Sequence, residues 1–182
     1  YTGAYSNVID KINISTVGNA TDFGDLTQAR NYLGSCASTI RGVWGGGNTG
    51  SVVNTIDYVT IATAGNATDF GDLPAAQAYV VGCSSDTRGL FGGGTDSGFA
   101  NVNIISYITI ASAGNATDFG DLTESRFSLS ACSSPTRGVF GGGYTATYVN
   151  TIDYVIIAST GNATDFGDLS VARYQLASCS SN

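Results

Sequence analysis

The sequence contains no histidine, only two prolines and only seven lysines and arginines among its 182 residues. The cations are scattered and the net charge is −7, so we expect no partner among nucleic acids or anionic membranes. No apolar run reaches the roughly 18 residues that a membrane span needs. There is also no basic segment followed by an apolar stretch, the pattern of a signal peptide, so we expect a processed product or a fragment.

Charged residues are scarce as well, at 12% of the chain, whereas glycine is abundant, with 25 residues. A glycine-rich composition can indicate a disordered linker. Here, however, hydrophobic residues make up 42% of the chain and are spread along all of it. The composition therefore favours a packed core, and the length suits one sizeable domain.

The nonapeptide GNATDFGDL occurs four times, beginning at residues 18, 65, 114 and 161. Such a period predicts a repeat architecture. The chain divides into units 1–47, 48–94, 95–143 and 144–182 of one repeat domain. The first three units end in IRGVWGGG, TRGLFGGG and TRGVFGGG, but the fourth stops before this segment. The last unit therefore lacks about one strand.

Four segments in each unit are typical of β-strands. Residues 54–61 alternate with apolar side chains on both faces, and FGDL is short enough for an outer strand. Residues 30–38 are rich in small side chains, and RGVWGGG places an aromatic residue before a glycine run. No window has a helical period. We therefore predict an all-β, β-propeller-like fold with repeats of about 47 residues and four antiparallel strands per blade.

The order of these motifs resembles that of kelch repeats over the whole chain. Kelch repeats have a glycine pair after their second strand and an aromatic residue on their outer strand, which implies a propeller. Two features depart from that family: Asp precedes Tyr in IDY, and Phe stands in DFGD where Trp is usual. Units with TRGVFGGG and GNATDFGDL also resemble uncharacterised virion proteins of marine bacteriophages, tail or fibre proteins among them. That resemblance implies a location on a virion or outside the cell.

One cysteine stands at an equivalent position in each unit: Cys36, Cys83, Cys132 and Cys179. Equivalent positions of stacked repeats are commonly too far apart for a disulfide, whose Cα atoms lie within about 7 Å. A four-thiolate metal site would be expected to contain a C-x-x-C pair, which is absent. We therefore expect four structural cysteines that are buried and unpaired.

Each unit also carries a D-x-x-D pair. These residues are Asp22, Asp25, Asp69, Asp72, Asp118, Asp121, Asp165 and Asp168. Paired carboxylates can bind Ca²⁺ or act as acid and base, so these eight are the candidate Ca²⁺ ligands. Four identical copies argue against a single asymmetric active site. The favoured interpretation is structural, with one Asp accepting backbone N–H groups and the other pairing with an arginine.

Two sets of arginines recur. Arg41, Arg88 and Arg137 begin the RG strand, where we predict a structural ion pair between blades with one of the repeated aspartates. Arg30, Arg126 and Arg173 precede the cysteine strand, and Gln77 replaces this arginine in the second unit. Whatever this second set does, it tolerates the loss of charge once.

The segments that follow each GGG vary between units, and function in repeat folds concentrates in such loops. The predicted ligand-binding residues in these segments are Tyr5, Phe99, Tyr144 and Tyr148. Aromatic residues among Ser, Thr and Asn commonly hold sugars, and they equally serve as loop anchors. Both interpretations stay open. No catalytic or cofactor-binding residue is predicted, and no cofactor.

The two ends of the chain are in phase. Residue 182 stops where an RGVFGGG strand is due, and residue 1 resumes after such a strand. If the chain closed on itself, residues 1–26 and 173–182 would share a blade that lacks its second strand. An open edge invites another chain. We expect the gap to be filled by a continuation of a longer chain, the favoured source, or by a neighbouring copy in an oligomer or fibre.

These features predict a non-enzymatic structural or adhesive repeat module, part of a phage virion or fibre. The alternative is a lectin-like propeller that binds host surface polysaccharide through the variable loops. An enzyme is not expected, because propeller enzymes need a unique polar cluster, commonly with histidine. Here the units are nearly identical and histidine is absent.

Overall fold

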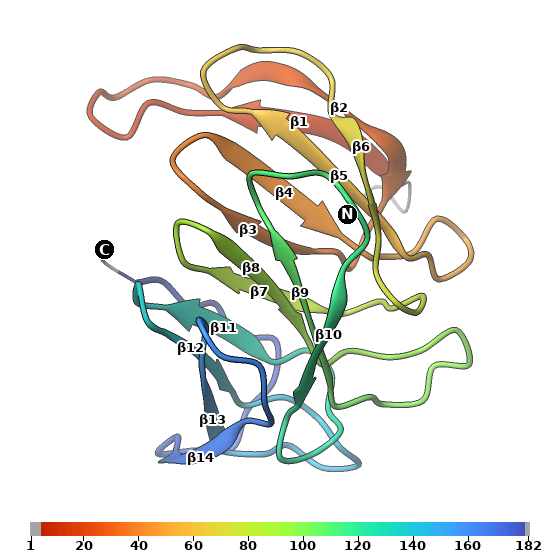
Figure 1. Ribbon diagram of the computed structural model, residues 1–182, viewed down its shortest axis with the longest axis vertical. Helices are drawn as coiled ribbons and strands as arrows, with labels where there is room; N and C mark the ends of the chain where they lie inside the picture. Colours follow the sequence, from red (N-terminus) through yellow and green to blue (C-terminus); the bar gives the residue numbers. More distant parts are fainter. Residues whose placement is uncertain (1–4, 181–182) are drawn as a thin grey trace.

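The computed structural model describes residues 5–180, and all of the regular structure in this range is β (Figure 1). Fourteen strands form one two-stranded and three four-stranded antiparallel sheets. The prediction of an all-β fold with four strand types is therefore confirmed. Within these residues no helix exists that could cross a membrane.

Each sheet is given a name that is kept below. The N-terminal hairpin consists of β1 (Ser6–Lys11) and β2 (Thr21–Arg30). Sheet A consists of β3 (Gly34–Ala37), β4 (Arg41–Gly45), β5 (Thr55–Thr60) and β6 (Thr68–Asp72). Sheet B consists of β7 (Val81–Ser84), β8 (Arg88–Gly92), β9 (Ile104–Thr109) and β10 (Thr117–Asp121). Sheet C consists of β11 (Ser130–Ser133), β12 (Arg137–Gly141), β13 (Thr151–Ile156) and β14 (Thr164–Asp168).

The sheets do not coincide with the sequence units. Each four-stranded sheet begins with the small-residue strand and RG strand of one unit and ends with the IDY and TDFGD strands of the next. The N-terminal hairpin therefore contains only the last two strand types. Residues 170–180 supply the first strand type once more, but they join no sheet.

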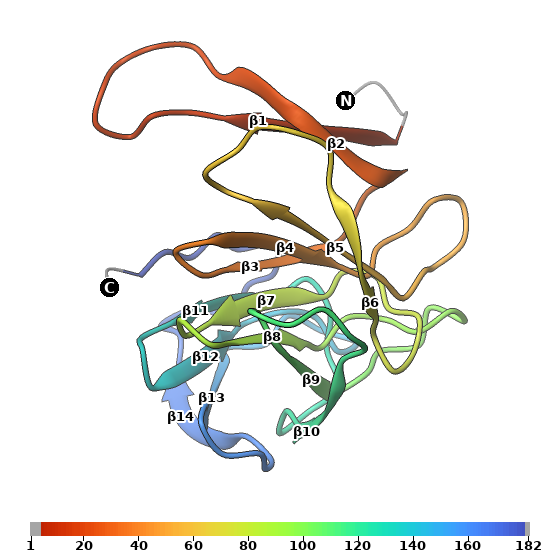
Figure 2. The ribbon, with the colours of Figure 1, turned by 45° about the horizontal axis from the view of Figure 1, so that its top comes forward.

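The sheets follow one another in chain order from the N-terminal hairpin to sheet C (Figures 1 and 2). They do not close into a ring within residues 5–180, because the N-terminal hairpin and sheet C lie at opposite ends of the series (Figures 1 and 2). Residues 173–180 instead lie along sheet C, where Gln175 N–H donates to Ser128 O and Ser178 Oγ donates to Ala131 O. A blade shared by the two ends, as expected for a self-closed chain, is therefore not formed.

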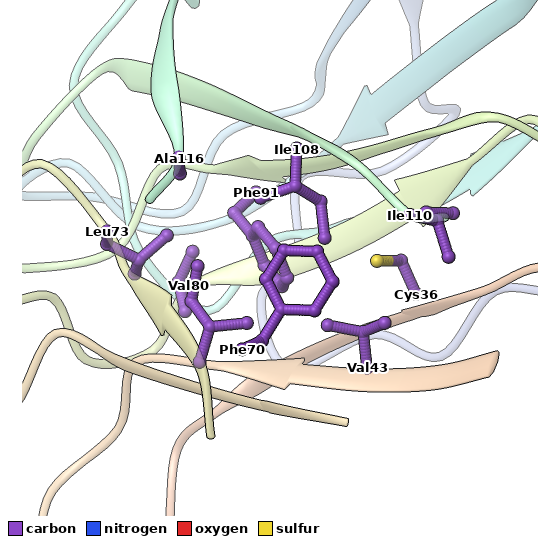
Figure 3. Packing of buried hydrophobic residues seen from close by; sticks show 10 residues of the cluster. Cys36, Val43, Phe70, Leu73, Val80, Phe91, Ile108, Ile110 and Ala116 are labelled. Carbon is purple, nitrogen blue, oxygen red and sulfur yellow. The ribbon is translucent and has the colours of Figure 1, made fainter. Parts of the chain in front are cut away.

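The core lies between successive sheets. Phe70 of sheet A packs with Phe91 and Ile108 of sheet B in the cluster that Figure 3 shows. An equivalent cluster joins sheets B and C around Phe119 and Phe140. Sheet B therefore buries both of its faces, which explains why its strands lack a polar side and why the sequence pattern is apolar throughout.

Within residues 5–180 the N-terminal hairpin has no inner strands, and a groove of about 460 Å³ lies between it and sheet A. Val8, Leu26 and Trp44 are among the residues that line it. Trp44 is only partly buried there, whereas Phe91 and Phe140, at the equivalent position of the next two sheets, are fully buried.

The repeated nonapeptide joins each sheet to the next through its own two halves. Between sheets A and B, Gly114 N–H donates to Phe70 O at 2.7 Å, and Ala116 N–H donates to Asp72 O at 2.8 Å. The side chain of Asn115 completes the contact, because its Oδ1 accepts from Asp72 N–H at 3.1 Å. The GNA half of one copy thus binds the FGD half of the preceding copy.

The same three hydrogen bonds recur at the two other junctions, where residues 65–67 bind the N-terminal hairpin and residues 161–163 bind sheet B. Glycine is required in the FGD half. Gly71 has φ +138°, and a Cβ atom there would lie 2.6 Å from the carbonyl oxygen of Gly114. A side chain at this position would push the two sheets apart.

A buried ion pair reinforces two of these junctions. Arg30 Nη2 lies 2.9 Å from Asp57 Oδ2, with both side chains fully buried. Thr27 Oγ1 donates to the second oxygen of Asp57 at 2.6 Å. Arg126 and Asp153 form the same pair, also at 2.9 Å and fully buried. Burial lowers the pKa of Arg30, and the carboxylate of Asp57 opposes that shift.

The third junction replaces both charges together. Gln77 and Ser106 occupy the positions of the arginine and the aspartate between sheets A and B, and both are buried. Gln77 Nε2 donates to Gly93 O at 3.2 Å. A buried carboxylate without its cation would be costly. An arginine charge is therefore not needed at position 77, because the residue at the aspartate position, Ser106, is neutral as well.

This pairing makes a prediction for the B–C junction. Arg126→Gln alone should destabilise the protein by about 3–5 kcal/mol, because Asp153 is left buried without a cation. The double variant Arg126→Gln/Asp153→Ser reproduces the Gln77–Ser106 junction and should recover most of that loss. Urea unfolding of the three proteins measures both effects. A double variant no more stable than Arg126→Gln would contradict the coupling.

Candidate functional site

The structure places the eight D-x-x-D aspartates on the outer strands β2, β6, β10 and β14, where none is fully buried. No group of three His, Cys, Asp or Glu side chains that could hold a metal ion is found within residues 5–180. Three of these aspartates use their backbone N–H to bind the asparagine of the next nonapeptide: Asp25, Asp72 and Asp121.

The arginines of the RG strands do not pair with those aspartates, so the expected interblade ion pair is wrong for Arg41, Arg88 and Arg137. Their guanidinium groups lie over Tyr58, Tyr107 and Tyr154, at 4.3, 4.8 and 4.8 Å from the ring centroids. The reason is the strand pairing, which sets each arginine beside the tyrosine of the adjacent strand, away from the TDFGD carboxylates.

Two of these arginines also reach the next sheet. Arg41 Nη1 donates to Ile110 O at 2.8 Å, and Arg88 Nη1 donates to Ile157 O at 3.0 Å. The ion pairs between sheets are formed instead by the second arginine set, in which the sequence interpretation left the partner open.

The four cysteines are all free, but only Cys36 and Cys83 are buried. Each of these two packs against the glycine of the RG strand in the next sheet. A Cβ atom at Gly89 of β8 would overlap the sulfur of Cys36, and one at Gly138 of β12 would lie 2.9 Å from the sulfur of Cys83. Cys132 is partly exposed and the fourth cysteine is exposed. The expectation of burial is therefore wrong for Cys132 and Cys179, because within residues 5–180 no further RG strand covers them.

Burial raises the pKa of the Cys36 thiol to about 12. It also raises the pKa of Cys83, and the nearby Cys36 and Cys132 add to that shift. Both thiols therefore stay protonated at neutral pH and are poor nucleophiles.

Exposed and partly exposed aromatic side chains form a continuous row across the repeats, which we name the aromatic ridge. It consists of Tyr32, Tyr79, Phe127, Tyr144, Tyr148 and Tyr174. Tyr32 and Tyr79 stack with ring centroids 3.9 Å apart, and Tyr148 and Tyr174 stack at 4.8 Å with their planes 6° apart. Phe127 and Tyr144 connect these two stacks through edge contacts of 5.4–6.3 Å.

The backbone presents the first two rings from an unusual conformation. Tyr32 and Tyr79 have φ values of 58° and 56°, in the left-handed region that bulky residues rarely occupy. Ser128 and Gln175 adopt the same conformation at the equivalent positions. Backbone hydrogen bonds of 2.8 Å hold the segments together, from Tyr79 N–H to Tyr32 O and from Gln175 N–H to Ser128 O. Strain of this kind concentrates at functional sites.

The ridge contains two of the four predicted ligand-binding residues, Tyr144 and Tyr148. The other two lie apart from it. Tyr5 donates its hydroxyl to Asn48 Oδ1 at 3.3 Å, and Phe99 is exposed without a ring contact to any other residue within 5–180.

The sequence interpretation missed the other four ridge residues: Tyr32, Tyr79, Phe127 and Tyr174. They lie in RNYL, QAYV, RFSL and RYQL, just before the small-residue strand and outside the variable loops. A signal was available, because every copy of this segment contains an aromatic residue.

Thiol reactivity should follow burial. In the native protein at pH 8, we expect iodoacetamide to modify Cys179 first and Cys132 more slowly, because both are accessible. Cys36 and Cys83 should stay unmodified until urea unfolds the chain, because burial suppresses their thiolates. Mass spectrometry of peptides after timed alkylation measures the order. Rapid native modification of Cys83 would contradict the packing of β7 against β12.

Comparison with known proteins gives no family assignment. No protein-family model matches the chain, and no curated protein matches its sequence. Function is therefore inferred from the aromatic ridge and the contacts between repeats.

Proposed function

We propose that the chain is a non-enzymatic structural and adhesive module, and that the aromatic ridge is its contact surface. The observation that carries this proposal is the continuous row of exposed and partly exposed rings across successive repeats. Tyrosine combines a rigid apolar face with a polar tip and is well suited to binding surfaces. The buried charged groups serve the junctions between sheets, as with Arg30 and Asp57, which supports a structural role.

The proposal extends to the architecture. Sheets A, B and C are blades in an arc of a β-propeller, with their small-residue strands toward a common centre. Support comes from the close approach of these strands: Ser84 Oγ of β7 donates to Ala37 O of β3 at 2.6 Å, and Ser133 Oγ of β11 donates to Ser84 O at 2.7 Å. Small side chains are required where strands converge in this way.

The location proposed for the module is a virion or the exterior of a cell, as part of a tail or fibre. This rests on the resemblance of TRGVFGGG and GNATDFGDL to repeats of bacteriophage virion proteins. A rigid array of nearly identical units suits an extended structural protein, because each unit needs only its neighbours for stability.

Carbohydrate is the partner class that the ridge favours among surface molecules. The parallel stack of Tyr148 and Tyr174 exposes flat apolar faces, which suit the CH faces of sugar rings. Asn101 beside it is engaged, since its Nδ2 donates to the backbone oxygens of Tyr144 and Thr145 and so fixes the loop. A lectin-like activity toward surface polysaccharide is therefore the second candidate function.

A glycan array tests both forms of the proposal. We expect the wild-type chain to bind one class of polysaccharide, and Tyr79→Asn and Tyr148→Asn each to weaken binding by about tenfold or more, since each removes a stacking face. Asn tolerates the left-handed backbone at Tyr79.

The matched control is Phe99→Asn, which also removes an exposed aromatic ring from a left-handed backbone position (φ 61°) but lies off the ridge. It should bind as the wild type does. Equal loss in all three variants would contradict the ridge as the contact surface. Absence of binding to any glycan would eliminate the lectin-like form and leave the structural one, which the detection of this sequence in purified virions by mass spectrometry would test.

A further inference from the structure

No sheet covers the face of sheet C that points away from sheet B within residues 5–180, although the equivalent faces of sheets A and B belong to the core. Phe166 of β14 is 54% exposed, whereas its equivalents Phe70 and Phe119 are each only 2% exposed. Those two are buried by the sheet that follows them in the chain. Phe166 retains its own edge contact with Tyr154, at 5.8 Å, so the face is already arranged as in the other sheets.

The N-terminal hairpin exposes the opposite half of the same interface. Ile14 is 94% exposed, whereas its equivalents Ile110 and Ile157, which each cover a four-stranded sheet, are 0% and 1% exposed. The third equivalent, Ile61, follows the two-stranded hairpin and is 46% exposed. Ile110 packs against sheet A, and Ile157 packs against sheet B. Ile14 and its neighbour Ile12 therefore present the surface with which each later sheet covers the preceding one.

The two free halves of the nonapeptide lie on these same faces. Within residues 5–180 no hydrogen bond joins residues 18–20 to an FGD segment, and none joins a GNA segment to residues 166–168. Gly167 has φ +135°, and a Cβ atom there would meet nothing within 4 Å. At the equivalent Gly120, a Cβ atom would lie 2.5 Å from the carbonyl oxygen of Gly161. Gly167 thus has the backbone conformation that Gly120 has when a GNA segment is bound to it, and the space beside it is open.

The charges are complementary as well. Arg173 is the equivalent of Arg126 and has the same backbone contact, its N–H donating to Val149 O at 3.1 Å. Yet its side chain is exposed, and it forms no ion pair within residues 5–180. Asp10 is the equivalent of Asp153 and is exposed without an ion pair in the same range.

From these four observations we infer that sheet C docks the N-terminal hairpin of a second copy of this chain, head to tail. In the junction, Phe166 and Leu169 of one copy are covered by Ile12 and Ile14 of the next. Residues 18–20 bind residues 166–168, and Arg173 pairs with Asp10. The junction therefore reproduces the backbone hydrogen bonds and the ion pair that hold sheet C to sheet B, together with the isoleucine part of the apolar contact. Within residues 5–180 the hairpin has no counterpart of Phe140.

Two partners could lie against the N-terminal hairpin: a second copy of the chain, or an RG strand that pairs with β1. Lys11 favours the second copy. In each complete sheet the arginine of the RG strand stacks on a tyrosine, as Arg41 does on Tyr58. Lys11 occupies that tyrosine position in β1, with its ammonium 5.6 Å from the Phe23 ring centroid. An added RG strand would bring its arginine beside Lys11, with like charges opposed. A copy that docks through its hairpin face brings no such strand.

Sedimentation velocity over a range of concentrations tests the inference with the full chain. The wild type should associate, and Ile14→Lys and Phe166→Asp should each weaken association by about tenfold or more, because each buries a charge in an apolar contact. Phe99→Asp is the matched control for Phe166→Asp and should associate as the wild type does. Thermal melts show whether each variant retains the fold.

Mixing the two interface variants gives a sharper result. A head-to-tail contact uses different faces of the two partners. Ile14→Lys retains an intact sheet C face, and Phe166→Asp retains an intact hairpin. Together they should form a one-to-one dimer that grows no further. A contact between identical faces would stay impaired in the mixture.

Charge reversal tests the ionic pair separately. Asp10→Arg and Arg173→Asp should each weaken association, and the chain that carries both should recover it, because every junction then contains the reversed pair. The inference is overturned if the folded wild type stays monomeric at its highest soluble concentration, if the mixture of interface variants stays monomeric, or if the doubly reversed chain is no better than the single variants.

Discussion

The structure depends on one contact, in which the GNA half of each nonapeptide binds the FGD half of the one before it. The contact is made from backbone groups, an asparagine side chain and a glycine that leaves room for a second backbone. Every internal copy uses both of its halves, one toward each neighbour. A change in either half would break a junction on one side, which explains why the same nine residues recur without variation.

The buried pair between Arg30 and Asp57 adds a second constraint, which applies to the two residues together. The two side chains must be either oppositely charged or both neutral. The Gln77–Ser106 junction satisfies the same requirement with neutral groups. Backbone contacts therefore require identity at each position, whereas the side-chain pairs require only complementarity.

The sequence predicted the all-β class and the four strand types, because period and apolar alternation are local properties. It did not predict where one sheet ends and the next begins, since pairing between units is non-local. The same limit explains the wrong prediction for Arg41, which was expected to pair with a carboxylate. Its partner is Tyr58, and the two residues meet only because of the β4–β5 register. The prediction that Cys179 is buried was wrong for another reason. Cys179 is equivalent to Cys83 in the repeat, but within residues 5–180 no further sheet packs against it.

In a repeat array the terminal units expose faces that are buried in the internal units, and solenoid proteins commonly cover these faces with polar capping residues. Here the outer faces of the N-terminal hairpin and sheet C each carry an exposed large hydrophobic residue, Ile14 and Phe166, beside the exposed charges of Asp10 and Arg173. Exposed apolar patches of this kind usually mark interfaces. The aromatic ridge differs, because its residues vary from unit to unit while the nonapeptide contacts between sheets do not, as Tyr79 and Ser128 show at one equivalent position. The nonapeptide residues that hold the sheets together are constant, whereas the residues of the proposed contact surface vary.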